Sequence, residues 1–326
     1  KTLEQATAAV NTLEVEMQNK TERISGWGPA FSKRPNDFIK RAGSSGAAGL
    51  GGLGLVLLAI AFLEFRSRKI DSTDAVVYGL GMPLVGTLPC MPSRSRRLVG
   101  ANGAAVRWKG MLTESVDAVR TLLLHAAHSE GLRVVMVTSA VGGEGKTSLS
   151  CHLAASLARS GRKTLLVDGD MRNPSCHRMF EVELESGLSE LLRGEIEVTE
   201  AIHTTPAPTL SVLPAGQCDA VALQSMAQGN LKPIFAQLRE QFDFVIVDSC
   251  PVLPVADSLL LGQQADAVLL SLLRDVSRMP KVYAAYQRLA MLGIRMLGAV
   301  VSGTQEAAYG SNYHYIVPKG REQAAV

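Results

Sequence analysis

The sequence predicts an α/β domain with a mainly parallel sheet that carries helices on both faces and is preceded by one transmembrane helix. Short runs rich in Val, Ile and Leu alternate with stretches of helical length, which is typical of strands buried on both faces of a parallel sheet. The apolar runs cover residues 134–140, 164–168, 210–214, 244–248, 267–273 and 296–303. Helical stretches include 146–160, 231–241 and 281–292. An uncharged apolar segment upstream predicts the membrane helix.

Residues 1–41 are predicted to form the end of an external helical arm. Apolar residues recur there at alternating steps of three and four, from Leu3 through Val10 to Met17. A short coiled coil and an ordinary amphipathic helix share this spacing, and both interpretations stay open. Because the chain starts with Lys1 and not with Met, we expect it to be a fragment or a processed product.

Residues 42–63 are predicted to form the transmembrane helix. The segment has no charged residue and is long enough to cross about 30 Å of hydrocarbon as a helix. Its glycines disfavour a soluble helix but suit close packing in a membrane. A buried core helix and a glycine-rich linker are the alternatives. Basic residues such as Lys40 and Arg66 flank the two sides in similar number, so charge alone does not orient the helix.

Three further segments complete the predicted organisation. Residues 64–106 contain prolines, glycines, the basic run at 93–97 and a short strand-like stretch at 82–89, and we assign them to a juxtamembrane linker. Residues 107–304 are predicted to form the α/β domain. Residues 305–326 are predicted to form a C-terminal tail that contains tyrosines.

The first buried run leads into AVGGEGKT at 140–147 and then into a helix, which is the strand, loop and helix setting of a P-loop. Its glycines let backbone N–H groups turn towards a phosphate chain, and the helix N-terminus adds partial positive charge. We expect Lys146 to bridge the β- and γ-phosphates and the Thr147 hydroxyl to ligate Mg²⁺. The loop residues predicted to bind ATP are Gly142, Gly143, Glu144, Gly145, Lys146, Thr147 and Ser148.

Carboxylates follow two of the other buried runs. Asp168 ends TLLVD and Asp170 comes two residues later, where paired carboxylates can hold Mg²⁺ and accept a proton from an attacking hydroxyl. Asp248 ends FVIVD in a Walker B arrangement and is predicted to orient magnesium. Arg172 is predicted to stabilise phosphate charge. Asp257 is left between capping the next helix and a catalytic role.

Composition excludes other classes of function. The chain has 33 Lys and Arg against 30 Asp and Glu, a net charge of +3, so it lacks the basic footprint of a nucleic-acid binder. We expect no nucleic-acid partner. The five cysteines lack the spacing of a metal site, which favours reduced thiols in a cytosolic compartment.

The ordered motifs SAVGGEGKTS, LLVDGDMRNP and FVIVDSCPVL resemble those of the bacterial tyrosine kinases, which belong to the MinD-like group of P-loop NTPases. The similarity extends to GLSELLRGE at 187–195, LPAG at 213–216, ADAVLL at 265–270 and LGIRMLGAVVSG at 292–303. The resemblance implies an ATP- and Mg²⁺-dependent kinase and the C-terminal part of a longer protein. It assigns catalysis to Lys146, Asp168, Asp170 and Asp248, and the metal to Thr147, Asp168 and Asp248.

The resemblance also assigns residues outside the three motifs. The asparagine with which the family reads adenine falls at Ser302, and the helix that mediates ring assembly falls at Glu114 and Arg120, with Asp117 in place of the middle arginine. The autophosphorylated tail has three candidate acceptors, Tyr309, Tyr313 and Tyr315. The alternative for the tail is a segment whose aromatic residues pack on the domain.

The predicted function is a membrane-anchored protein-tyrosine kinase that autophosphorylates its tail and regulates exopolysaccharide chain length and export. The implied partners are further copies of the chain in a ring, the polysaccharide polymerisation and export machinery, and the membrane. The implied location is the bacterial inner membrane, with residues 66–326 cytoplasmic and residues 1–41 external or periplasmic. The alternative is a co-polymerase scaffold that uses ATP binding as an assembly switch. A partitioning ATPase fits poorly, because Val141 stands where that group has a lysine.

Overall fold

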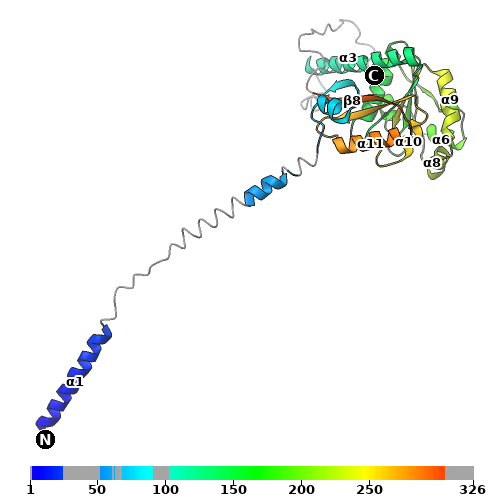
Figure 1. Cartoon of the computed structure of the whole chain (residues 1–326). Coiled ribbons are helices and arrows are strands. Elements are labelled where there is room, and N and C mark those ends of the chain that lie inside the picture. The colour runs from blue at the N-terminus through cyan, green and yellow to red at the C-terminus, as the bar shows by residue number, and fades with distance from the viewer. Residues whose placement is uncertain are drawn as a thin grey trace. The chain divides into compact units, whose positions relative to one another are not determined.

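The computed structural model describes residues 2–24, 52–60, 62, 68–90, 103–184 and 186–304 of the chain. The chain divides into two compact units, Lys1–Arg66 and Ser67–Val326, which are described separately (Figure 1).

The first unit contains helix α1, Thr2–Ile24, and a helical stretch at residues 52–60. The apolar side chains of that stretch are more than half exposed, from 53% for Ile60 to 72% for Leu55. The predicted transmembrane helix at 42–63 lies in large part outside the described residues. None of the helices in the described ranges combines the length and the apolarity needed to cross a membrane.

The second unit follows the predicted alternation of strands and helices closely. Its elements are the π-helix η1 (Ala75–Gly79), β1 (Leu84–Pro89), α3 (Gly103–Glu130), β2 (Val134–Thr138), α4 (Lys146–Arg159), β3 (Thr164–Gly169), α5 (Cys176–Phe180), α6 (Leu188–Arg193), α7 (Val198–Ala201), β4 (His203–Thr204), β5 (Leu210–Leu213), α8 (Ala220–Ala227), α9 (Leu231–Gln241), β6 (Phe244–Ser249), α10 (Asp257–Gly262), β7 (Ala267–Leu273), α11 (Met279–Met291) and β8 (Met296–Thr304).

The strands of the described residues form one sheet with the order β1-β8-β7-β2-β6-β3-β5-β4. Every pairing between neighbours is parallel except β4 with β5, so the predicted parallel sheet is confirmed. β2, β6 and β3 lie together at its centre, although β3 follows β2 in the chain and β6 comes much later. The ends of these three strands therefore meet at one edge of the sheet, because parallel strands point the same way.

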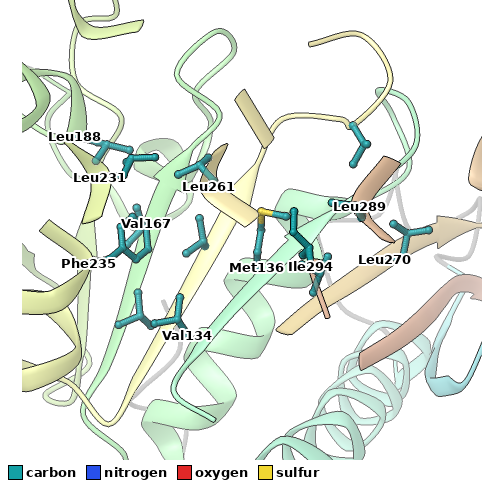
Figure 2. Packing of buried hydrophobic residues seen from close by; sticks show 14 of the residues in the cluster. Val134, Met136, Val167, Leu188, Leu231, Phe235, Leu261, Leu270, Leu289 and Ile294 are labelled. Carbon is teal, nitrogen blue, oxygen red and sulfur yellow. The ribbon is translucent and has the colours of Figure 1, made fainter. Parts of the chain in front are cut away.

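Helices cover both faces of the sheet, as predicted. Strand residues alternate between two buried clusters, so that Val135 and Val137 face α3 and α4 while Val134 and Met136 face α9, α10 and α11. α3 lies on the opposite side of the sheet from α10 and α11 (Figure 1). Figure 2 shows the second cluster, in which the fully buried Phe235 of α9 lies against strand side chains. We expect its truncation to alanine to cost about 3–5 kcal/mol of folding free energy.

The stretch at 82–89, which the sequence analysis assigns to a linker, contributes strand β1 to the sheet. β1 pairs in parallel with β8, and α3 packs closely over it. Gly86 permits this approach, because a Cβ there would lie 2.5 Å from a methyl carbon of Val119. Flanking prolines and glycines and the short length of the strand obscure it in the sequence. Likewise α3 begins at Gly103, upstream of residue 107, where the sequence analysis starts the domain.

The segment just upstream of η1 is joined to the connection between β7 and α11. Ile70 N donates to Ser277 O at 2.9 Å, Asp275 N donates to Ile70 O at 2.8 Å, and Met279 N donates to Arg68 O at 2.9 Å. Ile70 is fully buried. These contacts make residues 68–70 part of the folded domain, within the range that the sequence analysis assigns to the linker.

Candidate nucleotide-binding site

The P-loop connects β2 to α4, as predicted, and glycines set its shape. Gly143 and Gly145 both have φ of +83°, a left-handed conformation that residues with a Cβ rarely adopt. A Cβ added to Gly142 or Gly143 would meet open space among the described residues. Both glycines are also exposed, so the loop is open at these two positions.

Glu144, predicted among the ATP-binding residues, braces the loop from inside. Its side chain is fully buried, and its Oε2 accepts a hydrogen bond from Val141 N at 2.9 Å. Its carbonyl oxygen accepts from the Ser271 hydroxyl of β7 at 2.8 Å. Burial raises the pKa of the Glu144 carboxyl, and the nearby Ser277 side chain and the Val141 N–H only partly oppose this shift. Glu144 thus holds the shape of the loop, and its carboxylate points into the protein.

Lys146 opens α4 and lies among carboxylates. Its Nζ is 2.6 Å from Asp170 Oδ2 and 3.4 Å from Thr147 Oγ1. Burial disfavours the charged ammonium, but attraction from Asp248, Asp170 and Asp168 outweighs that effect and raises the pKa of Lys146. The ammonium therefore carries its full positive charge near neutral pH, as phosphate binding requires.

Asp168 lies at the end of β3 and holds the following loop in place. Its Oδ2 accepts hydrogen bonds from Ser175 N at 3.0 Å and Cys176 N at 2.9 Å, and its Oδ1 accepts from Asp170 N at 3.3 Å. Burial raises the pKa of Asp168 despite these backbone donors. The loop after β3 is thus ordered around the carboxylate, not exposed as a solvated turn.

Asp248 of β6 lies directly opposite Asp168 in the sheet register. It is fully buried, and its Oδ1 accepts a hydrogen bond from the Ser150 hydroxyl at 3.1 Å. Burial raises the pKa of Asp248 to about 6, although Lys146 and the hydroxyls of Thr147 and Ser150 oppose the shift. The structure therefore brings the predicted carboxylates of two separate motifs into one buried cluster beside the P-loop.

Cys176, which no sequence motif indicates, is also a member of this cluster. Its Sγ lies 3.6 Å from Asp248 Oδ2, and one ligand atom each from Asp168, Cys176 and Asp248 lie within 4.8 Å of one another. The only signal in the sequence is that Cys176 closely follows the second carboxylate motif, which metal-binding spacing rules do not cover.

Arg172 and Asp257 form an ion pair. Arg172 Nε lies 2.6 Å from Asp257 Oδ2, and Nη2 lies 3.3 Å from Oδ1. Asp257 is the first residue of α10 and does not cap it, because Ala256 occupies the cap position. The capping alternative for Asp257 is therefore wrong. Arg172 is about half exposed.

Ser302 lies in β8 near the P-loop, since a Cβ on Gly145 would be 3.9 Å from its Oγ.

Arg120, assigned to oligomer contacts, is held within its own chain. Its Nη1 lies 2.9 Å from Asp117 Oδ1 and 3.1 Å from the Ser156 hydroxyl of α4. Glu114 is exposed on the same helix, α3. The candidate acceptors Tyr309, Tyr313 and Tyr315 lie outside the described residues.

The donor set fits ATP with magnesium. The Thr147 hydroxyl and the carboxylates of Asp168 and Asp248 supply oxygen ligands, which Mg²⁺ prefers. The open face of Gly142 and Gly143 and the charged Lys146 suit a phosphate chain.

Comparison with known proteins yields one family model and a consistent group of relatives. A model described as an AAA domain matches residues 132–279. The chain is 30% identical over 207 residues to the tyrosine-protein kinase YwqD of Bacillus subtilis, a match that covers 64% of this chain and 87% of that protein. It is 27% identical over 268 residues to the tyrosine-protein kinase ptk of Acinetobacter johnsonii, covering 80% of this chain but 36% of the relative.

The chain thus spans only about a third of the Acinetobacter relative. Among solved structures, the kinase domain of the Escherichia coli tyrosine kinase ETK superposes with a TM-score of 0.66 at 27% identity. That match covers 76% of this chain and 100% of the solved chain.

Proposed function

The chain belongs to the bacterial tyrosine-protein kinase family, and from this membership and the geometry of the site we propose that it phosphorylates tyrosines in the tail of a neighbouring copy. The observation that carries the proposal is the convergence of Lys146, Asp168, Asp170 and Asp248 beside the P-loop. A phosphate chain, a divalent cation and a hydroxyl acceptor would all find matching groups there.

In the proposed reaction the tyrosine oxygen forms a bond to the γ-phosphorus of ATP while the bond from that phosphorus to the bridging oxygen breaks. Lys146 and the P-loop amides would bind the phosphate oxygens, and Thr147, Asp168 and Asp248 would hold the cation. Mg²⁺, when bound, neutralises charge on the phosphates. We assign the tyrosine proton to the Asp168 and Asp170 pair, whose carboxylates lie next to the lysine.

The test is phosphotyrosine formation by the full chain with ATP and magnesium. We expect Lys146→Met to lower it at least about a hundredfold, because the phosphate charge loses its partner. Lys232→Met, which removes an exposed lysine of α9, should leave it unchanged. Melting curves of both variants separate loss of chemistry from loss of fold. Equal activity of Lys146→Met and wild type would contradict the proposal.

We further propose that the chain is anchored in the bacterial inner membrane through residues 42–63, with the kinase domain in the cytoplasm and residues 1–41 outside. The exposed apolar side chains at 52–60 support this placement, since they match a lipid environment. The proposed role in exopolysaccharide chain length and export comes from the resemblance of the sequence motifs. It predicts that a strain with Lys146→Met makes polysaccharide of altered length on electrophoresis.

A scaffold that binds ATP without transferring phosphate is the second candidate. The observation that favours it concerns Arg120, which is hydrogen-bonded to Asp117 and Ser156 of its own chain. Ring assembly would need this arginine to contact a neighbouring chain. Mass spectrometry of residues 305–326 discriminates between the two. Phosphate on the tail tyrosines after incubation with ATP supports the kinase, whereas unmodified tyrosines together with intact ATP binding support the scaffold.

A further inference from the structure

The carboxylate cluster contains a group that magnesium chemistry does not need. Mg²⁺ takes oxygen ligands, whereas Cys176 presents a thiol to the same cluster as Asp168 and Asp248. All three residues are fully buried. A sulfur and two carboxylates within 4.8 Å of one another form a donor set that suits zinc and related soft cations.

The distances fit such a cation. Zinc binds sulfur at about 2.3 Å and carboxylate oxygen at about 2.1 Å with tetrahedral angles, which separates the two ligand atoms by about 3.6 Å. Cys176 Sγ and Asp248 Oδ2 are 3.6 Å apart. A second thiol, Cys151 of α4, lies 3.9 Å from Cys176 Sγ, close to the roughly 3.8 Å between two thiolates on one zinc ion.

The ligands are also oriented by neighbouring groups, as in natural metal sites. Two backbone N–H groups, from Ser175 and Cys176, hold Asp168 Oδ2, and the Ser150 hydroxyl holds Asp248 Oδ1. The Cys176 N–H bond to Asp168 fixes the start of α5, which carries the thiol. The three donors therefore need little rearrangement to meet on one ion.

We propose that Asp168, Cys176 and Asp248 form a binding site for a thiophilic divalent cation such as Zn²⁺, and that this cation inhibits the kinase by occupying the place of magnesium. The thiol proton leaves as the sulfur–metal bond forms. The inhibitory part rests on the proposed function, because it takes Asp168 and Asp248 as magnesium ligands. The binding part rests on the cluster alone.

The direct test titrates the reduced, metal-free full chain with Cd²⁺ and follows the ultraviolet charge-transfer band of the cadmium–thiolate bond. We expect one tight equivalent in wild type and at least about tenfold weaker binding in Cys176→Ser and Cys176→Ala. Cys250→Ser is the matched control, since it removes another buried thiol from outside the cluster and should keep the tight equivalent. Melting curves confirm that the variants are folded.

The kinase assay supplies the second readout. Zn²⁺ at fixed ATP should raise the Mg²⁺ concentration needed for half-maximal activity in wild type and in Cys250→Ser, but much less in Cys176→Ser. An active kinase whose Cd²⁺ titration is the same with and without Cys176 overturns the inference. A chain that binds Cd²⁺ through Cys176 yet transfers no phosphate overturns the proposed kinase activity and leaves the metal site standing.

Discussion

At the scale of one residue, the buried carboxylate of Asp248 lowers the stability of the folded protein once it is ionised. Its pKa lies near 6, above the ordinary 3.8 of an aspartate. Between these values the folded chain still holds a proton that the unfolded chain has lost, so unfolding becomes more favourable as pH rises through this window. The shift corresponds to about 3 kcal/mol once both states are ionised. At neutral pH the folding free energy of the metal-free protein is therefore less favourable by this amount.

Replacement of Asp248 by asparagine should reverse that cost. In chelator at pH 8, we expect Asp248→Asn to melt several degrees higher than wild type, since the buried charge is gone. At pH 4 the two should melt alike, because the wild-type carboxyl is then neutral. Asp275→Asn, which alters an exposed aspartate, should show no such dependence on pH. A variant that melts lower than wild type at pH 8 would refute this account, and calorimetry at both pH values measures it.

The residues of the site were predictable to the extent that each follows or ends a recognisable strand. Lys146, Asp168 and Asp248 follow buried apolar runs, and the ends of parallel strands gather at one edge of a sheet. Their mutual register was not predictable, because it depends on β6 entering between β2 and β3. Cys176 was missed for the same reason, as it approaches Asp248 only through that strand order.

At the scale of elements, the stretches 187–195 and 213–216, which both resemble the family sequence, are joined to each other in the fold. Glu190 of α6 accepts a hydrogen bond from Gly187 N at 2.8 Å through one oxygen and from Gln217 N at 3.0 Å through the other. Arg193 pairs with the same carboxylate at 2.9 Å. The carboxylate thus ties the stretch 187–195 to the residue that follows the stretch 213–216.

Removal of that carboxylate should loosen both stretches. We expect Glu190→Ala to cost about 2–4 kcal/mol of unfolding free energy, because two backbone donors and a mostly buried arginine lose their partner. Glu195→Ala is the control, since Glu195 also pairs with Arg193 but is half exposed, and it should cost clearly less than Glu190→Ala. Urea denaturation measures both, and equal costs would show that the bridging contacts add nothing.

Strand β1 shows the limit of prediction at this scale. Its pattern is short and lies among prolines and glycines, so local composition indicates a linker. Its place is set by contacts distant in sequence, namely pairing with β8 and packing under α3. The longer, strongly apolar strands are predictable from their local sequence alone. β7, for example, occupies the predicted residues 267–273.

At the scale of the whole molecule, the proposed reaction joins two copies of the chain. If wild type is mixed with Lys146→Met, we expect phosphate to appear on residues 305–326 of the variant, which cannot phosphorylate itself. The same variant with Tyr309, Tyr313 and Tyr315 changed to phenylalanine should stay unmodified. Mass spectrometry of chains that differ in mass reads both outcomes, and phosphate confined to the wild-type chain would exclude transfer between copies.

Membrane anchoring is the second property of the whole molecule that can be tested. Leu57→Asp and Leu58→Asp each place a charge in the helical stretch at 52–60, at a cost of about 2.5–3.5 kcal/mol in a membrane centre. We expect each to lower co-flotation of the full chain with lipid vesicles roughly a hundredfold in partition coefficient. Alanine at the same positions is the control. Unchanged flotation of the aspartate variants would argue against insertion of this stretch.

The hydrogen bonds of residues 68–70 to the connection between β7 and α11 have a mechanical consequence. Ile70 is bonded to Ser277, Ser277 Oγ accepts from Leu273 N, and β7 itself supports the P-loop through Ser271 and Glu144. A force applied at residues 68–70 would thus act on β7, the strand that supports the P-loop. A displacement of residues 68–70 would therefore reach the P-loop through Ser277 and β7.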